Sequence, residues 1–248
     1  MRYKYLLWTI LAFVFVVFVT VEPVMAGPGG KIARAVFETF WGKVLLAFLV
    51  IFFLPLILYA FFKEKMAERR ARNDLRYIAK RTNDRRFEWL AIKERVQDCF
   101  YRVHAAWGKQ DVSEAAEYMT DWYWQNQQIA FLDRWEREGL VNHCQVGSVR
   151  RIKPLLLIHR NDELPHEGSM LVLSICANMK DYLADRDTGA IIEGSNAFKD
   201  VETVWTFTMV NGNWRVSNIE EDSLSLAYAK MVKELPKIED TMVNEMKA

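Results

Sequence analysis

Residues 201–219 read VETVWTFTMVNGNWRVSNI, and this stretch predicts a β-hairpin. In its first half, the side chains at every second position would share one face of a strand, and most of them are large and apolar. They are Thr203, Trp205, Phe207 and Met209. Asn211-Gly212-Asn213 supplies the residues that a tight turn prefers, and Trp214–Ile219 continues as the returning strand. The hairpin predicts an antiparallel sheet in this half of the chain.

Two further strands are expected upstream of the hairpin. Residues 169–179 alternate in the same way and place five apolar side chains on one face: Leu171, Leu173, Ile175, Ala177 and Met179. Residues 146–158 are β-prone, and Pro154 within them indicates an edge strand or a bulge. Asp185–Gly189 is a cluster of turn-forming residues.

The segment before the strands has the period of helices. From Phe87 to Trp107, apolar residues recur at steps of three and four: Ile92, Val96, Cys99, Phe100, Val103 and Trp107. Asp111 and Thr120 are suited to begin two shorter helices, the second ending at Gly139 or Asn142. Residues 223–232 predict a short closing helix. About three helices followed by a run of strands predict an α+β fold.

Two apolar segments precede this domain. Residues 1–26 have a basic start, an apolar run and small residues at their end, which indicates a signal peptide cleaved after Ala26. An uncleaved first membrane helix is the alternative, because the apolar run is near the lower length of a span. Residues 44–62 contain no charge and predict a transmembrane helix with Pro55 inside it.

A basic segment, residues 63–86, follows the predicted span and is expected to continue as a helix or linker. Six of its cations lie close to the span: Lys63, Lys65, Arg69, Arg70, Arg72 and Arg76. Fewer cations precede the span, so the positive-inside rule predicts that residues 63–248 lie in the cytoplasm. The six cations are also candidates for contact with anionic lipid.

The net charge of +1 conceals a strong asymmetry. Residues 1–62 carry a charge of +3, residues 63–86 carry +6, and residues 87–248 carry −8. Because a nucleic-acid-binding domain would show a basic face, the acidic domain argues against direct binding of nucleic acid.

Several short motifs follow one another in residues 105–219. They are Ala105-Ala106-Trp107, Asp111, Asp185-x-Asp187-Thr188-Gly189-x-Ile191-Ile192-x-Gly194-Ser195, Glu202-x-x-Trp205-Thr206-Phe207 and Trp214-x-Val216-x-Asn218-Ile219. Their order and spacing resemble the Tim44-like domain family. The resemblance covers residues 87–235 and leaves 236–248 as a tail. It implies a cone-shaped fold like that of nuclear transport factor 2, with about three helices packed on a curved antiparallel sheet. Many relatives have Arg where this chain has Thr208, which puts any contact made by that Arg in doubt.

Aromatic residues are dense in this domain. Trp122, Tyr123 and Trp124 are consecutive, so one helical stripe cannot bury all three. We expect this cluster, together with the concave face of the sheet, to form a groove for an apolar peptide or an acyl chain. The groove residues are Trp122, Tyr123, Trp124, Trp135 and Phe207.

The chain shows no clear catalytic pattern. His143 beside Cys144 lacks a second pair at zinc spacing, and the Asp185 and Asp187 pair does not continue as a calcium loop. We therefore expect no catalytic residue, no metal and no cofactor, and we predict that the protein is not an enzyme. Enzymes of cone folds use an Asp or His base, which leaves one alternative set open: Asp133, Asp181, Tyr182 and His159. His104 is expected to be a core or half-buried histidine and not a ligand.

The resemblance implies a non-enzymatic, membrane-anchored interaction domain near protein translocation or membrane-complex assembly. We expect a bacterial inner-membrane protein whose cytoplasmic domain binds a protein partner, such as a translocase, a chaperone or a ribosome, and contacts anionic lipid. Two alternatives stay open. One is a periplasmic assembly factor of an envelope secretion complex, and the other is a module that binds lipid or a small molecule.

Overall fold

The computed structural model describes residues 39–161 and 165–221, together with residues 227–228, 231, 235 and 238–241. The chain forms two compact units, Met1–Phe62 and Lys63–Ala248. The predicted signal segment 1–26 lies outside the described residues, as do most of the predicted closing helix 223–232 and most of the tail 236–248.

Helix α3, Phe40–Thr82, contains the predicted span and most of the basic segment. Among the described residues it is the one helix that is long and apolar enough to cross a membrane. The large apolar side chains of residues 44–62 are mostly exposed, as a lipid-facing helix requires; Phe48 and Ile57, for example, are 62% and 63% exposed. The helix continues through Pro55 and through residue 62 without interruption.

The second half of α3 belongs to the unit that begins at Lys63, and it is amphipathic. Four of its side chains are buried at steps of four, four and three: Ala67, Ala71, Leu75 and Ile78. Asn83 then has a positive φ of 54°, which ends the helix. Residues 63–82 are therefore a packed helix of the domain and not a solvated linker.

The helices that follow match the predicted order but not every predicted type. Helix η1 (Arg85–Phe87) leads into α4 (Trp89–Gly108), which buries five of the six predicted apolar positions and leaves Trp107 half-buried. Asp111 caps the next segment through its side chain, as predicted, but that segment is the 3₁₀ helix η2 (Val112–Tyr118). The last predicted helix is α5 (Asp121–Gln127), the π-helical η3 (Gln128–Leu132) and α6 (Asp133–Arg137) in succession.

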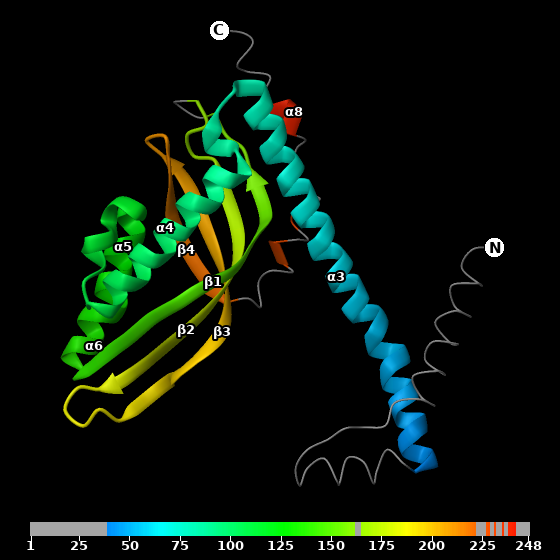
Figure 1. The fold of residues 1–248 in the computed structure, drawn as a ribbon, viewed down its shortest axis with the longest axis horizontal. Helices are drawn as coiled ribbons and strands as arrows, with labels where there is room; N and C mark the ends of the chain where they lie inside the picture. The colour runs from blue at the N-terminus through cyan, green and yellow to red at the C-terminus, as the bar shows by residue number, and fades with distance from the viewer. Residues whose placement is uncertain are drawn as a thin grey trace. The chain divides into compact units, whose positions relative to one another are not determined.

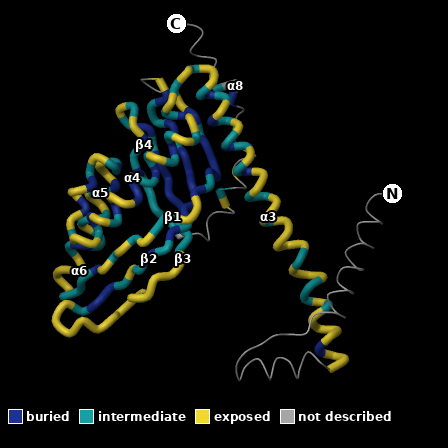
Figure 2. The backbone as a smooth tube through the Cα atoms, viewed as in Figure 1, coloured by how far each residue is buried: buried dark blue, intermediate teal, exposed yellow. Residues whose placement is uncertain are grey.

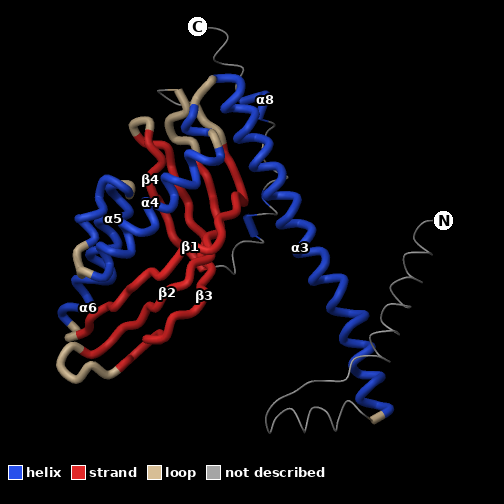
Figure 3. Tube along the Cα trace, viewed as in Figure 1, coloured by secondary structure: helices blue, strands red, loops and turns tan. Residues whose placement is uncertain are grey.

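Four antiparallel strands form one curved sheet in the order β1-β2-β3-β4 (Figure 1, Figure 3). They are β1 (Leu140–Ile158), β2 (Met170–Asp185), β3 (Ile191–Val210) and β4 (Asn213–Glu221). The predicted hairpin is confirmed, because Val210 pairs with Asn213 around Asn211 and Gly212. Both turn residues have positive φ, 51° and 74°, as a two-residue turn of type I′ requires.

The sheet extends further than the sequence predicts. Strand β1 begins at Leu140 instead of residue 146, and β3 begins at Ile191 instead of residue 201. Nearly every side chain of residues 191–200 is exposed, so these positions lack the apolar alternation that marks a half-buried strand (Figure 2). Gly194 has a φ of +85°, and a Cβ atom there would lie 2.3 Å from the carbonyl oxygen of Asp181.

Helix α4 crosses one face of the sheet, and the main core lies between them (Figure 1). The predicted faces of β2 and β3 are confirmed: Leu171, Leu173, Ile175, Ala177, Met179, Trp205, Phe207 and Met209 all lie in this core. A smaller cluster contains Val172 and Val204, which alternate with the core residues of β2 and β3, together with Leu155 and Leu156 of β1. Alternation along β2 and β3 places Val172 and Val204 on the opposite face of the sheet.

Candidate functional site

A basic stripe runs along the domain half of α3. Its members, spaced by four, three, four and four residues, are Lys65, Arg69, Arg72, Arg76 and Lys80. Since residues three and four apart are neighbours on a helix, these side chains share one side of α3. Lys65, Arg69, Arg76 and Lys80 are exposed, whereas Arg72 is half-buried.

Glu68 lies inside the basic stripe and organises two of its cations. Its carboxylate accepts hydrogen bonds from Lys65 Nζ at 2.9 Å and from Arg72 Nε at 3.0 Å. Burial disfavours the charged carboxylate, but the hydrogen bonds from Lys65 and Arg72 outweigh burial and lower the pKa of Glu68. The stripe therefore contains an ionised Glu68 at neutral pH.

Arg70 points away from the basic stripe. Its Nε atom lies 3.7 Å from Asp74 Oδ2, and its Nη2 donates to the carbonyl oxygen of Leu235 at 3.5 Å. Of the six predicted lipid contacts, Lys63, Arg70 and Arg72 are half-buried, while Lys65, Arg69 and Arg76 are exposed. The exposed three are the members best placed to meet an external ligand.

A groove with a basic lining lies between α3, α4 and β1, and we call it the basic groove. It consists of two neighbouring pockets of about 400 Å³ and 340 Å³ that share Arg72 and Trp89. The first is otherwise lined by Leu75, Arg76, Ala79, Lys80, Asn83, Phe87 and Glu88. The second is otherwise lined by Lys93, Gln97, Val149, Arg150, Arg151 and Ile152.

The two shared residues are stacked on each other. The guanidinium carbon of Arg72 lies 4.3 Å from the centre of the Trp89 ring, which is the geometry of a cation–π contact. Because Arg72 Nε also donates to Glu68, the guanidinium is held by both a carboxylate and an aromatic ring. The middle of the basic groove is therefore preorganised.

The cations of the basic groove differ in how they are paired. Arg151 lies 3.0 Å from Glu202, and Arg150 lies 3.8 Å from Asp200. By contrast, no carboxylate of the described part of the chain lies within ion-pair distance of Arg76, Lys80 or Lys93. These three cations keep charge available for a ligand.

The structure does not bring the five predicted groove aromatics together. Phe207 is 0% exposed, because α4 covers the sheet face that the predicted groove requires to be open. Tyr123 of α5 is 4% exposed and lies in the same core. Trp135 is half-buried and packs with Trp107 and Phe131, at centroid distances of 5.8 Å and 5.6 Å. Trp124 is also half-buried. Trp122 alone of the five is largely exposed, at 72%.

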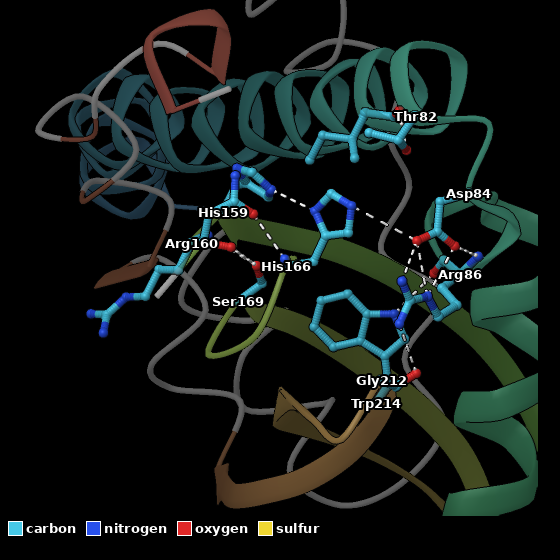
Figure 4. A network of polar contacts seen from close by, with 11 residues as sticks. Thr82, Asp84, Arg86, His159, Arg160, His166, Ser169, Gly212 and Trp214 are labelled. Carbon is cyan, nitrogen blue, oxygen red and sulfur yellow. Dashed lines mark hydrogen bonds and ion pairs between the residues drawn. The ribbon is translucent and has the colours of Figure 1, made fainter. Parts of the chain in front are cut away.

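A buried polar network joins segments that are distant in the sequence (Figure 4). His159 Nε2 lies 2.8 Å from His166 Nδ1, and His166 Nε2 lies 3.8 Å from Asp84 Oδ2. The single N–H of Arg86 Nε is shared between the two carboxylate oxygens of Asp84, at 2.9 and 3.0 Å, and Arg86 Nη2 donates to Asp84 Oδ2 at 2.6 Å. Arg86 Nη1 in turn donates to the carbonyl oxygen of Gly212 at 3.2 Å.

Further contacts extend this network to other elements. Trp214 Nε1 donates to the carbonyl oxygen of Arg86 at 2.9 Å, and His159 Nδ1 lies 3.0 Å from Thr241 Oγ1 of α8 (Ile238–Thr241). Burial disfavours the Asp84 carboxylate, but its hydrogen bonds with Arg86 prevail and lower its pKa. His159 and His166 are 5% and 3% exposed, so the network lies inside the fold and fastens the end of α3 to the sheet.

The residues considered for a catalytic site do not form one cluster. The register of β1 and β2 pairs Tyr182 with His143 and Asp181 with Cys144, at the opposite end of β1 from His159. Asp133 accepts a hydrogen bond from Gln128 Nε2 at 2.7 Å. Within the described residues, no group of three or more His, Cys, Asp or Glu side chains is placed to hold a metal ion.

The sequence alone does not indicate several residues of the basic groove and of the polar network. Trp89 and Lys93 are one helical turn apart, which is a signal for a shared helix face, but Arg150 and Arg151 come from a distant strand. His166 carries a positive φ of 68°, which sequence alone does not reveal. The basic groove and the polar network both depend on tertiary contacts between separate elements.

Comparison with solved structures gives weak likenesses. The intermembrane space region of the chloroplast protein ARC6 is 8% identical with a TM-score of 0.36, covering 50% of this chain and 92% of that chain. AclR from Streptomyces galilaeus is 12% identical with a TM-score of 0.24, covering 58% of this chain and 88% of that chain. Neither likeness is close enough to support a conclusion about fold or function. No curated protein matches the chain.

A family comparison is more informative. The model of the Tim44-like domain matches residues 77–221, which is more than half of the chain. The matched segment begins near the end of α3, includes α4 and ends with β4. It contains all the motifs on which the sequence resemblance rests, so that resemblance is confirmed, and the chain belongs to the Tim44-like domain family.

Proposed function

We propose that this protein is an anchored interaction domain of a bacterial inner membrane, with residues 63–248 in the cytoplasm. Its work would be to hold a protein-binding surface near protein translocation or membrane-complex assembly. Family membership and the apolar half of α3 support a membrane-associated protein-interaction role in translocation. We add four features to this role as parts of the proposal: the cytoplasmic orientation, the bacterial inner membrane, a signal segment at residues 1–26 and a cone-shaped domain.

The observation that carries the proposal is the continuity of α3. One helix contains both the exposed apolar residues 44–62 and the buried side chains of Ala67, Ala71, Leu75 and Ile78. The helix that contains the anchor therefore also contributes to the core of the domain, which ties the domain directly to the membrane. Restriction to the membrane raises the effective concentration of the domain for a partner at the same membrane.

The exposed cations Lys65 and Arg69 are proposed to contact anionic lipid. They are among the first cations after the apolar residues, and each such cation contributes about 1 kcal/mol near an anionic surface. Neither points into the basic groove, since neither lines its two pockets.

Trp122 and Ile129 are proposed to contact the protein partner. They are 72% and 64% exposed and lie seven residues apart in the run formed by α5 and η3. Exposed tryptophan is enriched at interfaces because it buries a large area with little loss of side-chain entropy. The pair therefore offers an apolar contact surface that does not require the core to open.

Alkaline carbonate extraction of membranes that contain the full chain tests the anchor. Phe52→Lys/Leu56→Lys places two charges in the apolar half of α3, at a cost of about 3 kcal/mol each for insertion at the centre of a span. Met66→Lys/Leu90→Lys is the matched control, since it changes two exposed apolar residues outside residues 44–62. We expect wild type and control to stay in the membrane pellet and the span variant to be extracted. Retention of the span variant would show that residues 44–62 are not required to hold the chain in the membrane.

A further inference from the structure

We propose that the basic groove binds an acidic, extended peptide segment of a partner protein. This inference rests on the proposed function, because it assigns the binding site of an interaction domain. The groove is built by three elements, α3, α4 and β1, and all of its lining residues lie in the unit Lys63–Ala248.

The shape of the groove fits a chain segment. Two pockets of about 400 Å³ and 340 Å³ have Arg72 and Trp89 in common in their linings, so the path along both pockets is longer than either pocket alone. An extended segment could follow this path and place side chains in both pockets. One compact anion would occupy only one of them.

The charge of the groove fits an acidic ligand. Arg76 and Lys80 line one pocket and Lys93 lines the other, and none of the three has a carboxylate within ion-pair distance among the residues that the structure describes. Arg76 and Lys80 precede the segment 87–248, whose net charge is −8, and Lys93 lies within that segment, so the basic lining is a local exception. Glu88 is the one carboxylate that lines either pocket. Carboxylates of a ligand would relieve the repulsion among these cations.

The centre of the groove supplies an apolar contact. Trp89 is half-buried and lines both pockets, with Arg72 stacked on it at 4.3 Å. Tryptophan and arginine are the residue types that most often dominate the energy of protein interfaces. A segment with acidic residues on both sides of one apolar residue would match this order of contacts.

A lipid surface fits the groove less well than a peptide. The groove cations come from three different elements around a hollow, whereas a bilayer presents a flat array of head groups. Lys65 and Arg69 suit such a surface better, because they are exposed and lie outside both pockets. Binding of vesicles through the groove cations is therefore the competing outcome of the test.

The test uses the full chain in phosphatidylcholine nanodiscs and a fluorescein-labelled peptide. The peptide has four glutamates on the two sides of a central leucine, in a Gly/Ser background, and the control peptide has glutamine at the four positions. The groove variant is Arg76→Glu/Lys93→Glu, with one substitution in each pocket. The matched variant is Arg137→Glu/Arg186→Glu, which makes the same charge change at two exposed arginines outside both pockets.

We expect wild type and the matched variant to bind the glutamate peptide equally and the groove variant to bind at least tenfold more weakly. The glutamine peptide should not bind, and salt should weaken binding of the glutamate peptide. Equal binding by the groove variant, or an equal loss in the matched variant, would overturn the proposal. If the glutamate variant unfolds, Arg76→Gln/Lys93→Gln replaces it, because this variant removes the same two positive charges without adding negative ones and should also weaken binding of the glutamate peptide.

Flotation with vesicles of phosphatidylglycerol separates the two ligand classes. If wild type does not bind the peptide and the groove variant alone loses vesicle binding, the groove belongs to a lipid head group and the proposal is wrong. If the groove proposal is wrong, the results of carbonate extraction and of the test of partner contact at Trp122 do not change. If the proposed function is wrong, the error appears in those two measurements instead.

Discussion

The two buried imidazoles of His159 and His166 face each other, with 2.8 Å between Nε2 of the first and Nδ1 of the second. One ring must donate and the other must accept, because two facing N–H groups would repel each other. Phe87 packs edge-on against both rings, at centroid distances of 6.3 Å and 4.8 Å. This pair connects the loop after β1 to Asp84, which follows the end of α3.

The first prediction concerns this histidine pair. His166→Asn keeps a residue that tolerates positive φ but removes the contacts with His159 and Asp84. We expect a loss of about 1–3 kcal/mol in the free energy of unfolding, because buried polar groups lose their partners. Pulse proteolysis in urea, on the full chain in nanodiscs, measures it. His143→Asn is the control, since His143 is exposed; an equal loss in both variants would contradict the role of the network.

The second prediction concerns the effect of acid on His104. Its ring packs against Phe100 and Trp205, and desolvation lowers the pKa of His104 to about 4. The unfolded chain takes up this proton near pH 6.5, so the contribution of His104 to stability falls as the pH drops from about 6.5 to 4. His104→Leu should remove this part of the pH dependence. A difference between wild type and variant that stays constant from pH 7.5 to 4.5 would refute the assignment.

The third prediction concerns the packing of α3. Leu75 is 1% exposed, so Leu75→Ala should lower the free energy of unfolding by about 2–5 kcal/mol. Met66 lies on the same helix and is 65% exposed, so Met66→Ala should change it by less than about 0.5 kcal/mol. The same urea titration compares the two variants. Equal, small effects would mean that residues 63–82 are a linker after all.

The fourth prediction separates two neighbouring aromatics. Tyr123 is buried, and desolvation raises its pKa, so Tyr123→Ala should destabilise the domain by about 3–5 kcal/mol. Trp122→Ala should leave stability unchanged and weaken partner contact. Thermal unfolding measures the first effect, and site-specific photo-cross-linking in cells at position 129, with and without Trp122, measures the second. An unchanged cross-link in the Trp122 variant would remove this surface from the proposed function.

The sequence predicts the parts of the fold in which burial follows a regular period. Leu171, Leu173 and Ile175 alternate along β2, and Val96, Phe100 and Val103 repeat along α4, so both elements are visible without a structure. The exposed half of β3, residues 191–200, has no such period. The sequence therefore predicts the start of β3 ten residues too late.

The sites are less predictable than the fold. The basic residues of α3 stand out in the sequence. Which of them pairs with Glu68, which pairs with Asp74 and which lines the basic groove depends on the direction of each side chain in the folded domain. The polar network needs residues 84, 159, 166 and 214, which only the folded sheet brings together. The predicted aromatic groove does not form, because the density of aromatic residues in the sequence does not show that α4 packs on the sheet face that contains Phe207.

Fusions to the C-terminus of the full chain test the central claim, an anchored domain on the cytoplasmic side. A fluorescent protein fusion reports a cytoplasmic end, and an alkaline phosphatase fusion is active only outside the cytoplasm. We predict fluorescence without phosphatase activity, because the cations after the apolar half of α3 favour retention on the inner side. Phosphatase activity without fluorescence would contradict this orientation and would favour an envelope assembly factor.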